Sequence, residues 1–190
     1  MMLMLRHLPN LITTLRLAAA PTTAGLLVAG HFNAAFGLFA FAGLSDAADG
    51  FLAKRFNLAS RLGRFLDPAA DKALMLAAFV TLAILDDVPA WLAVTVITRD
   101  LLILLGLASA VALRAPIAVE PLFLGKVCTA LQVLYIGWHL AALAFEFPSA
   151  TFAPADAYLV GAFAWISGFA YLGVWLKAMR AVHVQDGRRA

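Results

Sequence analysis

Charged residues are scarce in this chain. Asp, Glu, Lys and Arg make up 13% of its 190 residues, whereas a soluble globular domain typically carries about 25%. Hydrophobic residues make up 64%, and this balance is typical of an integral membrane protein. Because about 20 apolar residues cross a bilayer as a helix, the length leaves room for about six spans with short loops and no separate soluble domain.

Cysteine is nearly absent as well. Cys128 stands alone, so an intrachain disulfide is excluded, and a single cysteine in an apolar run usually only packs. The four histidines are scattered singly, without the spacing of a zinc site. They are His7, His31, His139 and His183. The net charge of +3 indicates basic loops that face anionic lipid, so we expect no nucleic-acid partner.

Long polar linkers are also missing, and short breaks separate the apolar runs. The runs predict membrane-spanning helices at residues 11–30, 33–55, 66–85, 89–113, 125–146 and 155–180. Residues 1–10 are predicted to lie on the membrane surface, because Arg6 follows a short apolar run and no small-residue cleavage site comes after it. Residues 181–190 form a cytoplasmic tail. The predicted fold is an all-α integral membrane protein, a six-transmembrane-helix bundle.

Basic residues are absent from every second loop. The loops after the first, third and fifth predicted spans contain no Lys or Arg. Thirteen of the 14 basic residues fall on the opposite side or at the helix ends adjoining it, and Arg99 alone lies nearer mid-span. Because cytoplasmic loops carry the excess of Lys and Arg, we expect that side, with both termini, to be cytoplasmic.

Four aspartates interrupt the second and third predicted spans. Asp46 and Asp49 are three residues apart, and Asp67 and Asp71 are four apart. Each spacing puts both acids on one face of a helix. A carboxylate at membrane depth is costly and is usually functional. The two pairs therefore predict a functional site at the cytoplasmic side of the bundle.

A divalent metal explains why four acids would gather. Without one they would repel each other, and some would stay protonated. Oxygen-only ligands suit Mg²⁺, Mn²⁺ or Ca²⁺, and two metals in a carboxylate cluster form a clamp for phosphoryl displacement. We expect two Mg²⁺ or Mn²⁺ ions. The small residues Gly50 and Ala53 beside the acids would let a phosphorylated ligand approach the backbone.

Two other interpretations of the acids stay open at this point. Asp67 precedes Pro68 and could be the N-cap of a helix whose first residue is proline. Intramembrane acids also line proton and cation pathways, so a transporter is the more distant alternative. Acids of a pathway would be spread across the bilayer, whereas these four fall on one side.

The acids belong to a longer pattern. From Asp46 the sequence is D-x-x-D-G-x-x-A-K, then eight residues, then G-x-x-x-D-x-x-x-D ending at Asp71. This resembles the signature of the CDP-alcohol phosphatidyltransferase family and matches seven of its eight fixed positions. The exception is Lys54, where the family usually has Arg. The six predicted spans extend the resemblance, so residues 1–190 are expected to form a single membrane domain of this family.

The resemblance implies a reaction. A CDP-linked donor binds at the cytoplasmic or matrix face, an alcohol attacks the lipid-side phosphorus, and CMP leaves. By resemblance the four aspartates hold the metals, and Asp71 is also the general base. The implied CDP-binding residues are Asp49, Gly50, Ala53, Lys54 and Gly63. Lys54 keeps the charge of the usual Arg but loses its bidentate fork. A homodimer is implied, in the bacterial cytoplasmic or mitochondrial inner membrane.

The acceptor alcohol is predicted from shorter similarities. The segments FAFAGLSDAADGFLAK, ITRDLLIL and FLGKVCTALQVL resemble the cardiolipin-synthase branch, which joins CDP-diacylglycerol to phosphatidylglycerol. The opening LPNLITTLRLAAAP is similar to both this branch and the phosphatidylglycerophosphate-synthase branch. The alternative is the phosphatidylglycerophosphate-synthase branch, which uses glycerol 3-phosphate and more often has G-R-E in span four. The candidate contacts for the acceptor phosphate are Arg99, Lys126 and Arg16. Arg99 could instead form a buried ion pair with Asp100, and Lys126 could extend toward the membrane surface.

Overall fold

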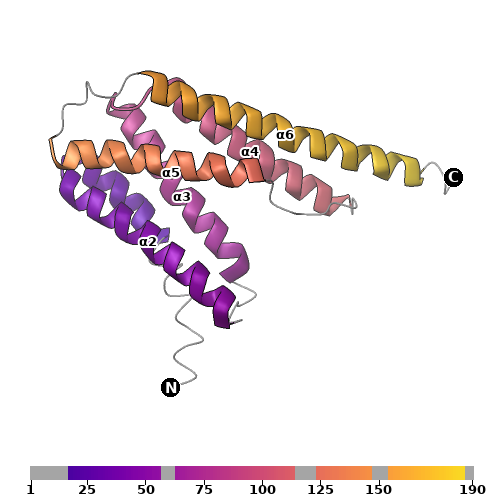
Figure 1. Cartoon of the computed structure of the whole chain (residues 1–190), viewed down its shortest axis with the longest axis horizontal. Coiled ribbons are helices and arrows are strands. Elements are labelled where there is room, and N and C mark those ends of the chain that lie inside the picture. Colours follow the sequence, from indigo (N-terminus) through magenta and orange to yellow (C-terminus); the bar gives the residue numbers. More distant parts are fainter. Residues whose placement is uncertain (1–16, 57–62, 114–122, 147–153, 187–190) are drawn as a thin grey trace. The chain divides into compact units, whose positions relative to one another are not determined.

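The structure, a computed structural model, describes residues 17–56, 63–113, 123–146 and 154–186. Within these ranges only the backbone is described for residues 46–56, 63–71, 111 and 181–186. All the regular secondary structure in the described ranges is helical (Figure 1). The helices are Leu17–Val28, α2 (Phe32–Phe56), α3 (Gly63–Ile84), α4 (Ala90–Ala112), α5 (Phe123–Ala144) and α6 (Pro154–Asp186).

The helices match the six predicted spans closely, which confirms the all-α class. Three described segments are long and apolar enough to cross a membrane: Ala90–Ala110, Phe123–Ala144 and Pro154–Arg180. The other apolar segments, within the part searched, are shorter: Leu17–Val28, Phe32–Ser45 and Lys72–Ile84. The three long segments indicate a membrane protein. The count of six transmembrane helices stays a prediction.

The chain divides into two compact units. The first contains residues 1–88 and 136–151, and the second contains residues 89–135 and 152–190. The helix α5 contributes its first part to the second unit and its last part to the first unit.

In the first unit, three helices are each followed, two residues after their last helical residue, by a residue with left-handed backbone. These residues are Gly30, Asp86 and Glu146, with φ of 75°, 58° and 54°. At the end of α3 the N–H of Asp87 donates to the carbonyl of Leu82 over 3.0 Å. This bond is characteristic of a Schellman cap, which satisfies the last carbonyls of a helix in a tight turn. The three caps lie in the loops that lack Lys and Arg.

Among the described residues, the core of the first unit is mostly apolar and contains a buried contact between two polar side chains. Nδ1 of His139 on α5 lies 2.9 Å from Oδ2 of Asp87, which follows the end of α3. Both side chains are largely buried, so the contact ties the α3–α4 loop to α5. The apolar residues that are fully buried here include Leu27, Ala35, Ala78, Phe79, Leu82, Ile136 and Leu140.

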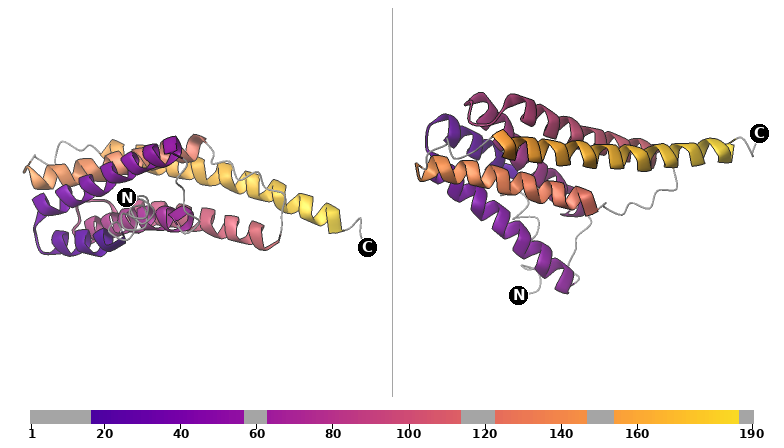
Figure 2. Two further views of the ribbon diagram at one scale, coloured as in Figure 1. Left: turned by 90° about the horizontal axis from the view of Figure 1, so that it is seen from below. Right: turned by 45° about the horizontal axis from the view of Figure 1, so that its top comes forward.

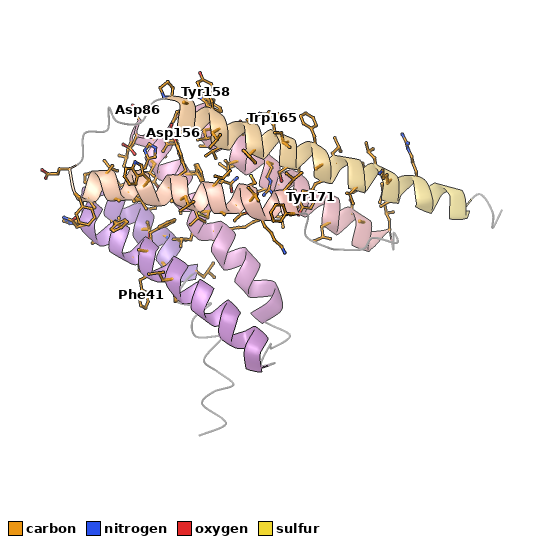
Figure 3. All side chains as sticks on the ribbon, in the orientation of Figure 1. Phe41, Asp86, Asp156, Tyr158, Trp165 and Tyr171 are labelled. Atoms are coloured by element: carbon orange, nitrogen blue, oxygen red, sulfur yellow. The ribbon has the colours of Figure 1, made fainter. Side chains whose placement is uncertain are left out.

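In the second unit, α4 and α6 lie side by side (Figures 1 and 2). The side of α6 that is buried carries mostly small residues at alternating intervals of three and four. Such a seam lets two helices approach closely within a membrane. Larger aromatic residues of α6, such as Trp165 and Phe169, are exposed instead, and Trp165 points away from the helix pair in Figure 3. The buried residues of α6 include Ala157, Val160, Ala164, Ser167 and Ala178.

Contacts at three levels set the register of α4 against α6. The first is a ring stack of Trp91 on Tyr158, with centroids 5.2 Å apart. The second joins Arg99 to Ser167. The third is a 2.9 Å hydrogen bond that Nε1 of Trp175 donates to Oγ of Ser109. Residue numbers rise together on both helices, so α4 and α6 run in the same direction.

The parallel direction of α4 and α6 requires the chain between them to return. Trp91 and Ser109 are separated along α4 by about 27 Å at 1.5 Å per residue, which approaches the thickness of about 30 Å of a bilayer's hydrocarbon core. The 22 residues of α5 reach about 33 Å and provide a return path of that length. The three helices are therefore long enough for the consecutive spans that the sequence predicts.

Gly161 offers a test of the α4–α6 seam. A Cβ at this position would lie 2.7 Å from the Trp91 ring, whereas a Cβ at Gly173 would meet nothing within 4 Å. We expect Gly161→Leu to destabilise the protein by about 1–3 kcal/mol through overpacking, which lowers the melting temperature in detergent by about 2–10 °C. The matched control, Gly173→Leu on the same helix, should melt like the wild type. Equal losses in both variants would contradict the seam.

Candidate active site

The motif lies on two consecutive helices of the first unit. The helix α2 carries Asp46, Asp49, Gly50, Ala53 and Lys54, and α3 begins at Gly63 and carries Asp67 and Asp71. The side chains of all these residues lie outside the described part of the structure, so their contacts with one another stay a prediction. The described backbone is helical at every one of these positions. The spacings of three and four residues therefore place each acid pair on one helix face.

The helix boundaries correct one interpretation of Asp67. If Asp67 were an N-cap, α3 would begin at Pro68. The helix begins at Gly63 instead, and its first turn contains no acidic residue. Asp67 thus lies in the second turn, where the backbone amides ahead of it already belong to the helix. The capping interpretation was wrong, and the functional interpretation of Asp67 gains weight.

The two acid pairs lie at similar distances from the connection between their helices. The helix α2 ends at Phe56 and α3 begins at Gly63, so the connection spans at most about 25 Å. At 1.5 Å per residue, Asp49 lies about 10 Å before the end of α2 and Asp71 about 12 Å after the start of α3. A short connection with these offsets keeps both pairs near one end of their helices.

The donor set of the motif fits hard divalent cations. Four carboxylates supply only oxygen, which Mg²⁺ and Mn²⁺ prefer and which zinc and copper sites seldom use alone. Among the side chains that the structure does describe, no group of three or more His, Cys, Asp or Glu could hold a metal ion.

Among the charged side chains described in the second unit, that of Arg99 is the most buried. Its side chain is 6% exposed. One terminal nitrogen, NH1, donates to Oδ1 of Asp100 over 2.6 Å, and the other, NH2, donates to Oγ of Ser167 over 2.7 Å. The ion pair that the sequence suggested is therefore present. The Nε atom is buried, and within the described residues no atom accepts a hydrogen bond from it.

The ring of Tyr171 lies beside this guanidinium and links it to the start of α5. The Cζ atom of Arg99 is 5.9 Å from the centroid of the Tyr171 ring, within the range of a cation–π contact. The hydroxyl of Tyr171 lies 2.8 Å from the place that a Cβ of Gly125 would occupy. The neighbouring Lys126, in the first turn of α5, is exposed.

The three residues predicted to bind the acceptor thus lie in different surroundings, and one of them is not described. Arg99 lies in a polar cluster with Ser167 and Tyr171, and Lys126 lies on an exposed face of α5 next to Gly125. Arg16 lies outside the described residues. The sequence analysis missed Ser167 and Tyr171, although polar residues four apart in a long apolar helix were a usable signal.

Comparison with known proteins identifies the family. The chain belongs to the CDP-alcohol phosphatidyltransferase family, whose model matches residues 6–177. The members of this family are transferases, so the chain is assigned to an enzyme family and the prediction from the motif is confirmed. This membership favours an enzyme over a transporter.

Individual relatives carry two different names. The chain is 34% identical over 157 residues to the cardiolipin synthase (CMP-forming) of Rattus norvegicus and to that of Homo sapiens, covering 74% of this chain. It spans about half of their length, 52% in each case. It is 30% identical over 197 residues to the CDP-diacylglycerol--glycerol-3-phosphate 3-phosphatidyltransferase of Bacillus subtilis, covering 92% of this chain and 97% of that protein.

Proposed function

We propose that this protein transfers the phosphatidyl group of CDP-diacylglycerol to phosphatidylglycerol, forming cardiolipin and CMP, and that it acts as a homodimer in the bilayer. The observation that carries the proposal is the eight-position motif on α2 and α3 of a chain that the family model matches over residues 6–177. The names of the mammalian relatives support this acceptor.

In the proposed reaction the motif residues have separate tasks. Asp46, Asp49, Asp67 and Asp71 hold two Mg²⁺ or Mn²⁺ ions, which when bound neutralise the donor's pyrophosphate and the leaving CMP. The cytidine diphosphate is bound by Asp49, Gly50, Ala53, Lys54 and Gly63. Asp71 accepts the proton of the attacking hydroxyl. The hydroxyl oxygen then bonds to the lipid-side phosphorus, and the bond from that phosphorus to the CMP oxygen breaks with its electron pair on CMP.

We expect the four aspartates to be separable by kinetics. Chelation should abolish CMP release, and Mg²⁺ or Mn²⁺ should restore it. We expect a loss of both activity and metal-dependent donor binding in the variants Asp46→Asn, Asp49→Asn and Asp67→Asn. Asp71→Asn should lower kcat about 100-fold or more, in the range of a lost general base, while keeping more of the affinity for CDP-diacylglycerol.

Asp86→Asn is the matched control for these substitutions. Asp86 is exposed and has left-handed backbone, a conformation that Asn adopts readily. This variant should keep wild-type kinetics. Full activity in excess chelator would contradict the metal requirement. Wild-type turnover of Asp71→Asn would contradict the role of Asp71 as general base.

The proposed orientation places the motif on the cytoplasmic side. We expect Ser60→Cys, in the connection between α2 and α3, to resist a membrane-impermeant maleimide in spheroplasts. His31→Cys, at an exposed position on the other side, should be labelled. Both are made in a Cys128→Ala background, although Cys128 is buried. Labelling of Ser60→Cys and protection of His31→Cys would reverse the orientation.

The electrostatics near Arg99 favour phosphatidylglycerol as the acceptor. Its phosphate is a diester with one negative charge, whereas glycerol 3-phosphate is a dianion near neutral pH and calls for more than one fixed cation. Asp100 already offsets much of the charge of Arg99. An acceptor that is itself a lipid can also reach the site laterally from the bilayer.

The name of the Bacillus subtilis relative favours the second candidate, glycerol 3-phosphate. Arg64, Lys72 and Lys126 all fall on the predicted cytoplasmic side and together could bind a dianion. This alternative keeps the family and changes only the acceptor.

Competition between the two acceptors distinguishes these reactions. Purified protein in liposomes with CDP-diacylglycerol, phosphatidylglycerol and glycerol 3-phosphate should form cardiolipin as the main product, with one CMP for each. Accumulation of phosphatidylglycerophosphate without cardiolipin would overturn the acceptor assignment and leave the phosphatidyl transfer itself intact.

A further inference from the structure

One nitrogen of the Arg99 guanidinium, Nε, has no acceptor among the described residues. A buried arginine at mid-span is costly unless its N–H groups are satisfied. Its NH1 and NH2 atoms donate to Asp100 and Ser167, but its Nε atom is buried without an acceptor among the described residues. Because a guanidinium fork matches the oxygens of a phosphate, the unpaired donor suits an anionic phosphate oxygen.

Two residues of α6 define the position of that guanidinium. Ser167 accepts a hydrogen bond of 2.7 Å from NH2, and Tyr171, one turn later, places its ring 5.9 Å from Cζ. Between them Gly168 lies against the aliphatic part of the arginine, since a Cβ there would be 3.7 Å from Cγ. The helix α6 thus contacts both the aliphatic chain of the arginine, at Gly168, and its guanidinium, at Ser167 and Tyr171.

Tyr171 is itself held by the first turn of α5. Three atoms of its ring and hydroxyl lie within 3.4 Å of the Cβ position of Gly125, and the hydroxyl at 2.8 Å is the closest. Any side chain at residue 125 would therefore displace the Tyr171 ring. The position of the guanidinium on α4 depends through Tyr171 on a glycine in α5.

We propose that Ser167 and Tyr171 are positioning residues that hold Arg99 with its Nε–H toward the phosphate of the acceptor. This inference rests on the proposed function, because the phosphate is the acceptor's. The two residues act through Arg99. They belong to α6 and are not residues of the motif on α2 and α3, so we expect them to affect acceptor binding and to leave donor binding unchanged.

Steady-state kinetics of the full-length protein in liposomes test this role. We expect Ser167→Ala and Tyr171→Leu to raise KM for the acceptor about tenfold, the loss of about one hydrogen bond to a charged group, with KM for CDP-diacylglycerol within twofold of wild type. Tyr171→Phe keeps the ring and should raise the acceptor KM less than Tyr171→Leu does. Ser109→Ala is the matched control, because it removes the α4–α6 hydrogen bond from Trp175 without touching Arg99.

A double-mutant cycle with Gly125 makes the test sharper. Gly125→Ala should raise the acceptor KM by displacing Tyr171. The double variant Gly125→Ala/Tyr171→Phe lacks the hydroxyl that meets the new Cβ first, so its effect should be smaller than the sum of the two single effects. Additive effects would show that the Gly125 contact does not act through Tyr171.

A binding measurement separates this proposal from the proposed function. Short-chain phosphatidylglycerol should raise the melting temperature of the wild type more than phosphatidylcholine does, and Ser167→Ala should abolish that difference while Ser109→Ala retains it. Product analysis of the wild type tests which acceptor is used, and the KM ratios are measured with that acceptor. Equal changes in donor and acceptor KM, or an unchanged phosphatidylglycerol effect in Ser167→Ala, would overturn the positioning role.

Discussion

A charge inside an apolar helix bundle must be neutralised, and this constraint organises the chain. Two buried ionisable groups among the described residues have side-chain partners: Arg99 contacts Asp100 and Ser167, and Asp87 contacts His139. The Arg99–Ser167 contact joins α4 to α6, and the Asp87–His139 contact joins the α3–α4 loop to α5, so the partners of buried charges also fix tertiary structure. For the four motif aspartates, we propose that bound cations supply the opposite charge.

The hydrogen bond between Arg99 and Ser167 depends on how closely α6 approaches α4. Small side chains such as Ala164 and Ser167 face the seam, and Gly161 and Gly168 admit the Trp91 ring and the stem of Arg99. A larger residue at any of these positions would separate the helices, and a separation of 1 Å would turn a hydrogen bond of 2.7 Å into no bond at all. The composition of α6 thus serves the polar cluster as well as the packing.

The local patterns of the sequence predicted the helices well. The predicted span 33–55 corresponds to α2 at Phe32–Phe56, and 89–113 to α4 at Ala90–Ala112. Helix ends were less predictable: α3 begins at Gly63, ahead of Pro68, and α6 continues to Asp186. The motif needed only local spacing, whereas the contact between Arg99 and Ser167 joins residues 68 apart. No periodicity indicates such a contact, because it depends on which helices pack together.

The division of labour between helices offers a physical reason why one family contains different acceptors. The residues proposed for the donor and the metals belong to α2 and α3, and those around Arg99 belong to α4 and α6. A substitution near Arg99 alters the charge and shape presented to the acceptor without changing any motif residue. Specificity depends on the difference between two binding free energies, and a few contacts around one guanidinium are enough to change that difference. Relatives that are 30% and 34% identical to this chain have names that state different reactions, and differences in such contacts would be enough to account for that.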